Sequence, residues 1–392
     1  MSFNVDETLL LACLRRGNPK ADQIAIKKYD CKPRTFKDGS SYTSNMFSVS
    51  VEYECDGKLF TQFMVCKVPY LCELYASCRK AGFYDKETIM YETVIPKLME
   101  ILPLSTVPKH YFTTESDVLM LEDLTEQGYC LADQVQWNLE RCVLLLEQLA
   151  RFHAASVKLN REDAAVVEVA SRVTFLTDEV ITKFMKCVYP YLLASLQAEK
   201  VDSSVLLNFA SYEKKINEGN IWAISKRVND FNALIHGNLK ANNIFLKNES
   251  NRSVAVKLVD YQTCMWNSPA LDLLYFYLVT VDCDVFQKHQ HEFLDRYLSS
   301  LNESLRSAGC DCTYTKDEYY ADLAGSRLYQ VCVLLFLGLY DVIEAIPGFH
   351  FTKNYPEVPS PVDLEKIRLN RTFRCRFLKW FRYFEKRGYF SN

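Results

Sequence analysis

Polar residues that could bind a metal ion or a charged ligand lie in two short stretches, each directly after an apolar segment. The first stretch contains His236, Asn238, Lys240 and Asn243, and the second begins at Asp260. Asn243 and Asp260 offer an amide oxygen and a carboxylate, and Mg²⁺ takes oxygen ligands from one or two such side chains. We therefore expect both residues to be metal ligands. The alternative is that they only cap local backbone.

A pair of strands is predicted near the N-terminus. Apolar and polar residues alternate with a period of two over residues 47–55, which is typical of a half-buried strand. Asp56-Gly57 follows and is a strong signal for a tight hairpin turn. Residues 59–68 then form the returning strand, which ends near Lys67, and a loop of small residues, 39–44, comes before the pair.

Helices are predicted in most of the remaining chain. Residues 85–102 have a helical pattern with Glu87 in the first turn, and Pro96 should end or kink this helix. A short apolar strand, residues 117–121, precedes Glu122, and residues 138–156 carry a broad apolar helical stripe. Strands therefore dominate before residues 122–125 and helices after them, except that residues 234–260 fit a strand, a loop and two more strands. We expect an α+β fold.

The composition limits the classes of function. The chain has 392 residues, of which 49% are hydrophobic, so it can bury a core in two domains. Its net charge of -3 gives no general electrostatic reason to bind nucleic acid or membrane. The longest apolar run, residues 331–340, is about half of the roughly 20 residues that a membrane-spanning helix needs, so we expect a buried helix and no membrane span.

The N-terminus and the cysteines indicate a cytoplasmic protein. The basic residues near the N-terminus follow its short apolar run instead of preceding it, unlike in a secretory signal. The fifteen cysteines are scattered and include no Cys-x-x-Cys pair. Free thiols in a reducing compartment are therefore expected.

Several short motifs occur in a fixed order along the chain. They are the Gly39–Ser44 loop, Val65-Cys66-Lys67, Phe83-x-x-x-Glu87-x-x-x-Tyr91, Leu119-Met120-Leu121-Glu122-Asp123-Leu124, Leu149-Ala150-Arg151-Phe152-His153-Ala154-Ala155-Ser156, the His236 loop, Asp260-Tyr261-Gln262 and Ser268-Pro269-Ala270-Leu271-Asp272-Leu273-Leu274-Tyr275. Together, over about residues 35–345, they resemble the ecdysteroid kinase-like (CHK kinase-like) family, relatives of choline and aminoglycoside kinases. The resemblance implies a two-lobed protein-kinase-like fold. Residues 1–124 would form a small β-rich nucleotide-binding lobe and hinge, and residues 125–392 a larger, mainly helical catalytic and substrate lobe.

The resemblance further implies that the chain binds ATP and Mg²⁺. A cation must meet the phosphates, and a helix carboxylate must hold that cation in place. Lys67 and Glu87 fit these roles, with solvated surface charges as the alternative. Gly39, Ser41 and Ser44 are expected to cover the phosphates through backbone N–H groups, with an ordinary hairpin turn as the alternative.

The same resemblance implies roles for Glu122, Asp123, Asn243 and Asp260. Glu122 and Asp123 would lie at the hinge, where main-chain groups read the adenine edge, although their side chains could instead be structural caps. Asn243 and Asp260 would be the metal ligands, as in kinases. Asp272 is expected to anchor a loop or cap a helix.

The position of the catalytic base is occupied by Asn238. In the family, an Asp at this place accepts the proton of the substrate hydroxyl or orients that hydroxyl. An amide can hydrogen-bond a hydroxyl but cannot accept a proton near neutral pH. His236 is expected to brace the loop. Lys240 lies either near the transferred phosphate or on the surface.

Two functions of different classes follow. The first is an ATP-dependent kinase that phosphorylates a hydroxylated small molecule, an ecdysteroid-like compound or a related alcohol, with catalysis impaired at Asn238. The alternative is a non-catalytic pseudokinase that binds a nucleotide or another ligand. A protein kinase is less expected because Asp260 does not begin an Asp-Phe-Gly motif. We expect a monomer whose partner is a small molecule and not nucleic acid.

The C-terminal segment mixes basic and aromatic residues over positions 368–387. Such a pattern could bind an anionic membrane or nucleic acid. We expect instead a terminal helix whose aromatic face packs on the large lobe.

Overall fold

The computed structural model describes residues 5–34, 44–69, 79, 82–114, 118–132, 137–172, 178–218, 231–250, 252–349 and 359–391. The chain divides into two compact units. Unit 1 comprises Met1–Val135 and Asn242–Gln262, and unit 2 comprises Gln136–Ala241 and Thr263–Asn392. The assignment of nucleotide-binding and catalytic roles to residues 1–124 and 125–392 stays a prediction.

Unit 1 is built around a five-stranded antiparallel sheet with the strand order β1-β2-β3-β5-β4. Its strands are β1 (Ala25–Pro33), β2 (Ser44–Cys55), β3 (Lys58–Pro69), β4 (His110–Thr113) and β5 (Leu119–Glu122). The predicted hairpin is confirmed: Asp56 and Gly57 join β2 to β3 and both have positive φ, at 55° and 71°. A two-residue turn with this geometry matches the twist of the strands that it connects.

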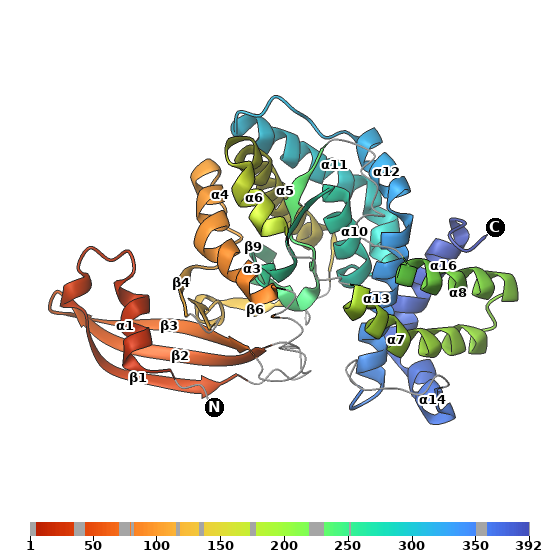
Figure 1. Ribbon diagram of the computed structural model, residues 1–392, viewed down its shortest axis with the longest axis horizontal. Coiled ribbons are helices and arrows are strands. Elements are labelled where there is room, and N and C mark those ends of the chain that lie inside the picture. The colour runs from red at the N-terminus through yellow and green to blue at the C-terminus, as the bar shows by residue number, and fades with distance from the viewer. Residues whose placement is uncertain are drawn as a thin grey trace. The chain divides into compact units, whose positions relative to one another are not determined.

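Helix α1 (Glu7–Arg15) covers one face of this sheet (Figure 1). Asp6 begins the helix by accepting a hydrogen bond from the backbone N–H of Leu9, as an N-cap residue does. The apolar side of α1 is buried against the inner strands of the sheet. The helix contributes Leu9, Leu10, Cys13 and Leu14, and the strands contribute Val49, Val51, Met64, Cys66 and Met120. This packing forms the core of the sheet and holds β3, the strand that carries Lys67.

The predicted helix over residues 85–102 is present and passes through Pro96. It consists of α3 (Phe83–Ile89), a π-helical turn (Met90–Val94) and α4 (Ile95–Ile101). The helix does not end at Pro96, because it continues to Ile101, and the other predicted outcome, a kink at the proline, stays a prediction. Pro96 has no backbone N–H, so the helix lacks one hydrogen bond at this point.

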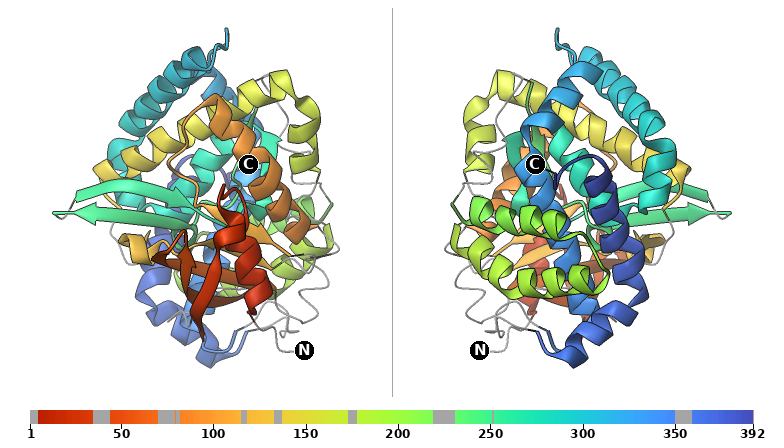
Figure 2. Two further views of the ribbon diagram at one scale, coloured as in Figure 1. Left: turned by 90° about the vertical axis from the view of Figure 1, so that its left-hand side faces the viewer. Right: turned by 90° about the vertical axis from the view of Figure 1, so that its right-hand side faces the viewer.

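A second sheet explains why unit 1 includes residues from two parts of the chain. β6 (Tyr129–Leu131) pairs with β8 (Ile244–Glu249), and β8 pairs with β9 (Arg252–Leu258). Figure 2 shows β8 and β9 as a long antiparallel ribbon. The predicted order of strand, loop, strand and strand over residues 234–260 is thus confirmed, with β7 (Ala233–Ile235) as the first strand.

Unit 2 is mainly helical. Its helices are α5 (Leu139–Glu162), α6 (Ala164–Ser171), α7 (Asp178–Ala198), α8 (Ser203–Glu218), α10 (Pro269–Thr280), α11 (Cys283–Ser307), α12 (Lys316–Gly325), α13 (Arg327–Ala345), α14 (Pro361–Leu369), α15 (Arg371–Phe373) and α16 (Lys379–Lys386). α7 and α8 lie side by side (Figures 1 and 2). The short strands β7 and β10 (Met265–Asn267) form an antiparallel pair that frames the His236 loop. The predicted α+β fold, with a β-rich first part and a helical later part, is confirmed.

Helix α13 forms much of the core of unit 2. Within the described residues it alone has the length and composition to cross a membrane, and 78% of its most apolar window is buried inside the protein. The C-terminal segment packs against it, and five of the six aromatic side chains of residues 368–387 are buried, namely Phe373, Phe377, Trp380, Phe381 and Phe384, whereas Tyr383 is half-buried. Helix α13 packs closely against its neighbours at Gly338, where an added Cβ would lie 3.0 Å or less from Leu192 and Phe377.

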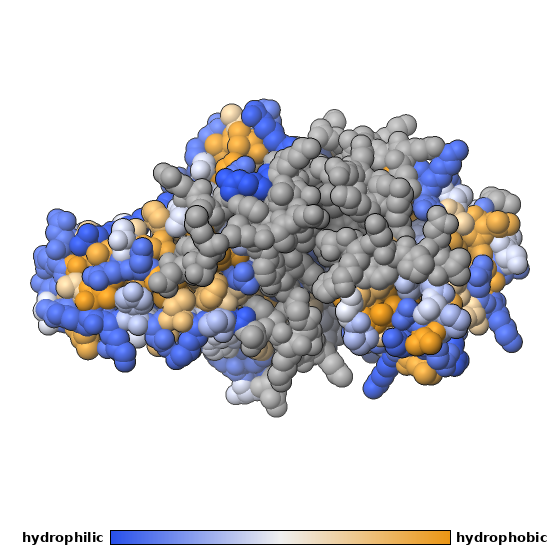
Figure 3. Space-filling view, turned by 60° about the horizontal axis from the view of Figure 1, so that its bottom comes forward, coloured by the Kyte–Doolittle hydropathy of each residue, from blue (hydrophilic) through white to orange (hydrophobic). Residues whose placement is uncertain are grey.

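The surface of the sheet in unit 1 exposes some large hydrophobic side chains, namely Tyr29, Leu59, Phe60 and Phe63. Figure 3 shows hydrophobic residues interspersed with hydrophilic ones over this part of the molecule.

Candidate functional site

Three charged residues of unit 1 meet in one cluster: Lys67 from β3, Glu87 from α3 and Asp260 from the segment after β9. Lys67 Nζ donates to both carboxylate oxygens of Glu87, at 2.9 and 2.8 Å, and to Asp260 Oδ1 at 3.0 Å. The ammonium group is thus held between two carboxylates. The structure brings together three residues that the sequence singled out for one function.

The charges of this cluster stabilise one another in a largely buried place. Burial alone would lower the pKa of Lys67, but the carboxylates of Asp260 and Glu87 outweigh it, and the pKa lies above its ordinary value. Burial raises the pKa of Glu87, and Lys67 opposes that change. Since each charge depends on its neighbours, loss of one member would alter the protonation of the others.

The Asp260 segment is held close to Asn243. Asn243 Nδ2 donates to Asp260 Oδ2 at 3.2 Å, and the backbone N–H of Val259 donates to the carbonyl of Asn243 at 3.1 Å. Asp260 itself has a φ of 72°, a left-handed conformation that Asp and Asn adopt more readily than other non-glycine residues. Such backbone outliers cluster at functional sites. Both residues offer hard oxygen ligands, so the donor set fits a magnesium ion.

Gln262 is a member of this cluster that the sequence interpretation did not assign to the site. Its Nε2 donates to Glu87 Oε2 at 3.0 Å, and both side chains are buried. A carboxylate can only accept, so the amide of Gln262 must turn its nitrogen toward Glu87. Gln262 therefore ties α3 to the segment that carries Asp260. Its place in the motif Asp260-Tyr261-Gln262 was the available signal.

The predicted phosphate loop is described only in part. Gly39 and Ser41 lie outside the described residues. Ser44 is the first residue of β2, where it pairs with Pro69 of β3 and is buried. Its role toward phosphate stays a prediction.

The side chains of Glu122 and Asp123 are engaged in contacts within unit 1. Glu122 accepts from Lys257 and from Gln127, and these hydrogen bonds outweigh burial and hold the pKa of Glu122 below its ordinary value. Asp123 accepts from Arg34 at 2.6 Å and from the backbone N–H of Thr125 at 3.0 Å. These contacts agree with the alternative that both side chains have a structural role, and their part in nucleotide binding stays a prediction.

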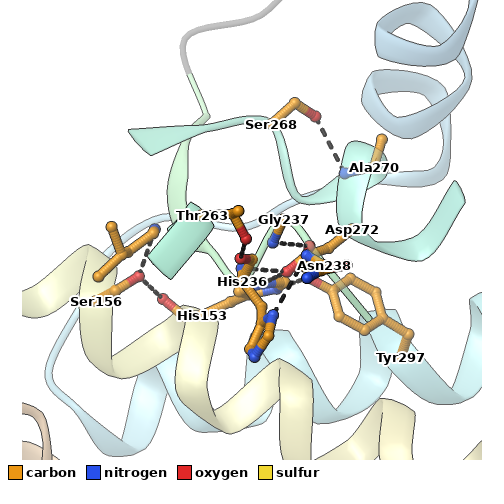
Figure 4. Close-up of polar contacts among 11 residues, drawn as sticks. His153, Ser156, His236, Gly237, Asn238, Thr263, Ser268, Ala270, Asp272 and Tyr297 are labelled. Atoms are coloured by element: carbon orange, nitrogen blue, oxygen red, sulfur yellow. Dashed lines mark hydrogen bonds and ion pairs between the residues drawn. The ribbon is translucent and has the colours of Figure 1, made fainter. Parts of the chain in front are cut away.

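In unit 2, Asp272 of α10 braces the loop that begins at His236 (Figure 4). Its carboxylate accepts from the backbone N–H of His236 at 2.6 Å and of Gly237 at 2.7 Å. His153 Nε2 lies 3.1 Å from the same carboxylate, and His153 Nδ1 lies 2.7 Å from the hydroxyl of Tyr297. All of these side chains are buried. The predicted anchoring role of Asp272 is confirmed.

The backbone of this loop requires glycine at position 237. Gly237 has a φ of 77°, and a Cβ there would lie 2.6 Å from the carbonyl oxygen of Thr263. The neighbouring His236 is fully buried, and its Nδ1 accepts from the backbone N–H of Asn238 at 3.3 Å. The hydroxyl of Thr263 donates to the carbonyl of His236 at 2.9 Å (Figure 4). His236 thus lies in the framework of the loop, in agreement with its expected bracing role.

Two tyrosines that the sequence interpretation did not assign to the site lie beside Asn238. The hydroxyl of Tyr275, on α10, donates to Asn238 Oδ1 at 3.0 Å. The hydroxyl of Tyr340, on α13, lies 3.4 Å from that of Tyr275. Lys240 Nζ lies over the ring of Tyr340, 5.6 Å from its centroid. Asn238 and Lys240, both candidate catalytic residues, are thus linked through these tyrosines.

The chain is similar to several solved structures and to one family profile. An ethanolamine kinase from Plasmodium vivax is 14% identical over 95% of this chain and 91% of that chain, with a TM-score of 0.47. An aminoglycoside 2'-phosphotransferase in complex with GDP is 12% identical over 88% of this chain and 93% of that chain, with a TM-score of 0.44. No curated protein matches the chain. The profile of the ecdysteroid kinase-like family matches residues 38–310, more than half of the chain. This chain therefore belongs to the ecdysteroid kinase-like family.

Proposed function

We propose that this protein binds Mg²⁺ and ATP and transfers phosphate slowly to a hydroxyl group of a small molecule, an ecdysteroid-like compound or a related alcohol. Its main support is the contact of Lys67 Nζ with the carboxylates of Glu87 and Asp260, at 2.8 to 3.0 Å. Burial of a lysine between two acids costs desolvation energy, and residues with such perturbed pKa values cluster at functional sites. Membership in a kinase-like family supports a nucleotide as the ligand.

Each residue of unit 1 has a distinct task in this proposal. Lys67 neutralises phosphate charge, and Glu87 keeps its ammonium group in place, with Gln262 holding Glu87. Asp260 and Asn243 supply the oxygen atoms for the metal. A magnesium ion held by these two residues would supply positive charge to the phosphate groups.

In this proposal, residues of unit 2 contact the acceptor, which is the small molecule whose hydroxyl group receives the phosphate. Asn238 can hydrogen-bond the acceptor hydroxyl, but it cannot take its proton near neutral pH. A positioned general base contributes roughly 10²- to 10⁴-fold to a rate. Positioning and charge neutralisation supply most of the remaining catalysis of phosphoryl transfer, and the residues for them are present. Slow transfer is therefore the expected result of the amide at position 238.

A second candidate function is ligand binding without catalysis. The observation that favours it is the hydrogen bond from Tyr275 to Asn238 Oδ1, since an acceptor hydroxyl would have to share this oxygen with Tyr275. The expected cytoplasmic location and monomeric state stay predictions. Every cysteine among the described residues is a free thiol, which supports a reducing compartment.

Calorimetry with ATP, with and without magnesium, tests the nucleotide part of the proposal. We expect magnesium-dependent binding that Lys67→Met abolishes. The control is Lys20→Met, which removes an exposed lysine paired with Asp56 in the same unit. A phosphorylation screen of hydroxylated small molecules then tests the reaction. Absence of binding at millimolar ATP would overturn both functions that involve a nucleotide, and binding without transfer to any acceptor would favour the pseudokinase.

A further inference from the structure

Helix α10 contacts the catalytic loop of unit 2 at two points, through residues three positions apart. Asp272 accepts from the backbone of His236 and Gly237, and Tyr275 donates to the side chain of Asn238. Residues at i and i+3 lie on the same face of a helix. One face of α10 therefore determines both the path of the loop and the direction of the side chain at its tip.

The contact of Tyr275 is specific to the oxygen atom of the amide. A tyrosine hydroxyl has one proton to donate, and Asn238 Oδ1 accepts it at 3.0 Å. Tyr275 is largely buried, with 6% of its surface exposed, which limits exchange of this hydrogen bond with water. An acceptor hydroxyl that approached Oδ1 would have to share that oxygen with Tyr275.

Tyr340 and Lys240 extend the same arrangement. The hydroxyl of Tyr340 lies 3.4 Å from that of Tyr275, and Lys240 lies over the ring of Tyr340. A hydroxyl can donate one hydrogen bond and accept others. Tyr340 can therefore help to keep the proton of Tyr275 directed at Asn238.

We propose that Tyr275 is a positioning residue that determines what the side chain at position 238 can do. In the native chain it holds the amide in one orientation by occupying Oδ1. With a carboxylate at the same position, the same hydroxyl would stabilise the ionised form. This inference rests on the proposed function for its catalytic meaning, but the hydrogen bond and its effect on charge can be measured without any substrate.

The test introduces the carboxylate by Asn238→Asp and then removes the hydroxyl by Tyr275→Phe. The matched control is Tyr277→Phe, because Tyr277 lies on the same helix, is buried, and its hydroxyl has no hydrogen-bond partner among the described residues. Carbon-13 NMR of labelled aspartate identifies the resonance that Asn238→Asp adds, and its titration gives the pKa of the new carboxylate.

We expect Tyr275→Phe to raise this pKa by about 1, because a hydrogen bond to the charged form is lost. Tyr277→Phe should leave it nearly unchanged. An equal pKa in all three proteins, or an equal change from both tyrosine substitutions, would overturn the proposal. If Asn238→Asp does not fold, the side-chain amide resonance of Asn238 in the native chain is followed instead, and only Tyr275→Phe should shift it.

Phosphotransfer assays separate this inference from the proposed function. Removal of Tyr275 in the Asn238→Asp protein should move the acid limb of the pH–rate profile upward and leave the KM for ATP unchanged. A pKa change without activity toward any acceptor would leave the role of Tyr275 intact and contradict the kinase function. Restored activity without any effect of Tyr275 on the pKa or on the pH–rate profile would support the kinase function and overturn the role of Tyr275.

Discussion

The charged side chains singled out in the two units make different contacts. In unit 1, Lys67, Glu87 and Asp260 keep their charged side chains in direct contact. In unit 2, the carboxylate of Asp272 is used for the backbone of the catalytic loop, and the side chain at the tip of that loop is the neutral amide of Asn238. Unit 1 thus presents a charged cluster, and the His236 loop of unit 2 presents an amide.

The contacts that hold the His236 loop in place are independent of the side chain at position 238. The loop of unit 2 is braced by Asp272 and by the required glycine at position 237. Neither feature depends on the identity of residue 238. The loop should therefore keep its shape when residue 238 is changed, and under the proposed function a single substitution should increase the rate of transfer.

The largest expected effect is an increase in turnover on Asn238→Asp. The new side chain is nearly isosteric, and it offers Tyr275 the same kind of acceptor atom. The rate of phosphotransfer should rise by roughly 10²-fold or more, while the affinity for ATP should change little. Initial-rate assays on both proteins, with an acceptor from the screen, give the ratio.

Asn238→Ala is the control for this comparison, because it removes the amide without adding a base. It should be no faster than the native chain. Equal rates for the native protein and Asn238→Asp would mean that proton removal is not limiting, and the contrast between the two units would then have no catalytic consequence.

The next effect concerns the charge of unit 1. Asp260→Asn removes one carboxylate from Lys67 but tolerates the positive φ of this position, which Ala would not. A hydrogen bond to a charged group is worth about 1.5–3 kcal/mol, so magnesium-dependent ATP affinity should fall by about 10- to 100-fold. Calorimetry with and without magnesium measures it. A change of the same size in the absence of magnesium would argue against a metal role for Asp260.

A smaller effect is expected from Gln262→Met, which keeps the size of the side chain but removes its donor to Glu87. Burial already raises the pKa of Glu87. Losing the hydrogen bond should raise it further, so protonation of Glu87 and loss of its ion pair with Lys67 should begin at a higher pH. ATP affinity should fall by about 3- to 10-fold, and more steeply as the pH is lowered.

Gln330→Met is the matched control for that substitution. Gln330 is also a buried glutamine that donates hydrogen bonds, but it lies in unit 2 and contacts Leu323 and Ser326. The control should reduce stability without changing the pH dependence of ATP binding. If both variants alter ATP binding equally, Gln262 acts only through general stability.

The sequence was sufficient to predict the cluster of unit 1 because its members stand in ordered motifs. Lys67 and Asp260 are 193 positions apart, yet Lys67 lies near the end of a strand, Asp260 follows one, and each has a residue type suited to phosphate or metal. The hairpin of β2 and β3 and the anchoring role of Asp272 were also predictable, since turn chemistry and helix position are local properties. The catalytic and binding roles of these residues stay predictions.

The partners of Asn238 could not be predicted in the same way. Tyr275 is 37 positions from Asn238, and Tyr340 is another 65 positions along the chain. Both lie in apolar helices where an aromatic residue is normally part of the core. Only the packing of α10 and α13 brings their hydroxyl groups together. Helical periodicity also does not reveal the π-helical turn that precedes Pro96, so the continuation of the helix past this proline could not be predicted.

The smallest expected effect contrasts two buried acids within unit 2. Asp272 accepts from two backbone N–H groups, whereas Asp341 of α13 accepts from the backbone N–H of Phe377 and lies 3.2 Å from Arg376 Nη1. Burial raises the pKa of Asp341 to about 7, which the charge of Arg376 only partly opposes. The carboxyl group therefore takes up a proton more readily in the folded protein than in the unfolded chain.

The sign of the pH dependence follows from this difference. Because the pKa of Asp341 is higher in the folded state, its contribution to stability is complete below the unfolded pKa and is lost as the pH rises through about 7. Between pH 6 and pH 8 the native protein should lose about 1 kcal/mol more than Asp341→Asn, a difference in Tm of roughly 2–4 °C. Thermal unfolding of both proteins at the two pH values measures this difference. An identical pH dependence would show that Arg376 keeps Asp341 ionised, and that unit 2, like unit 1, contains a buried acid stabilised by its cation.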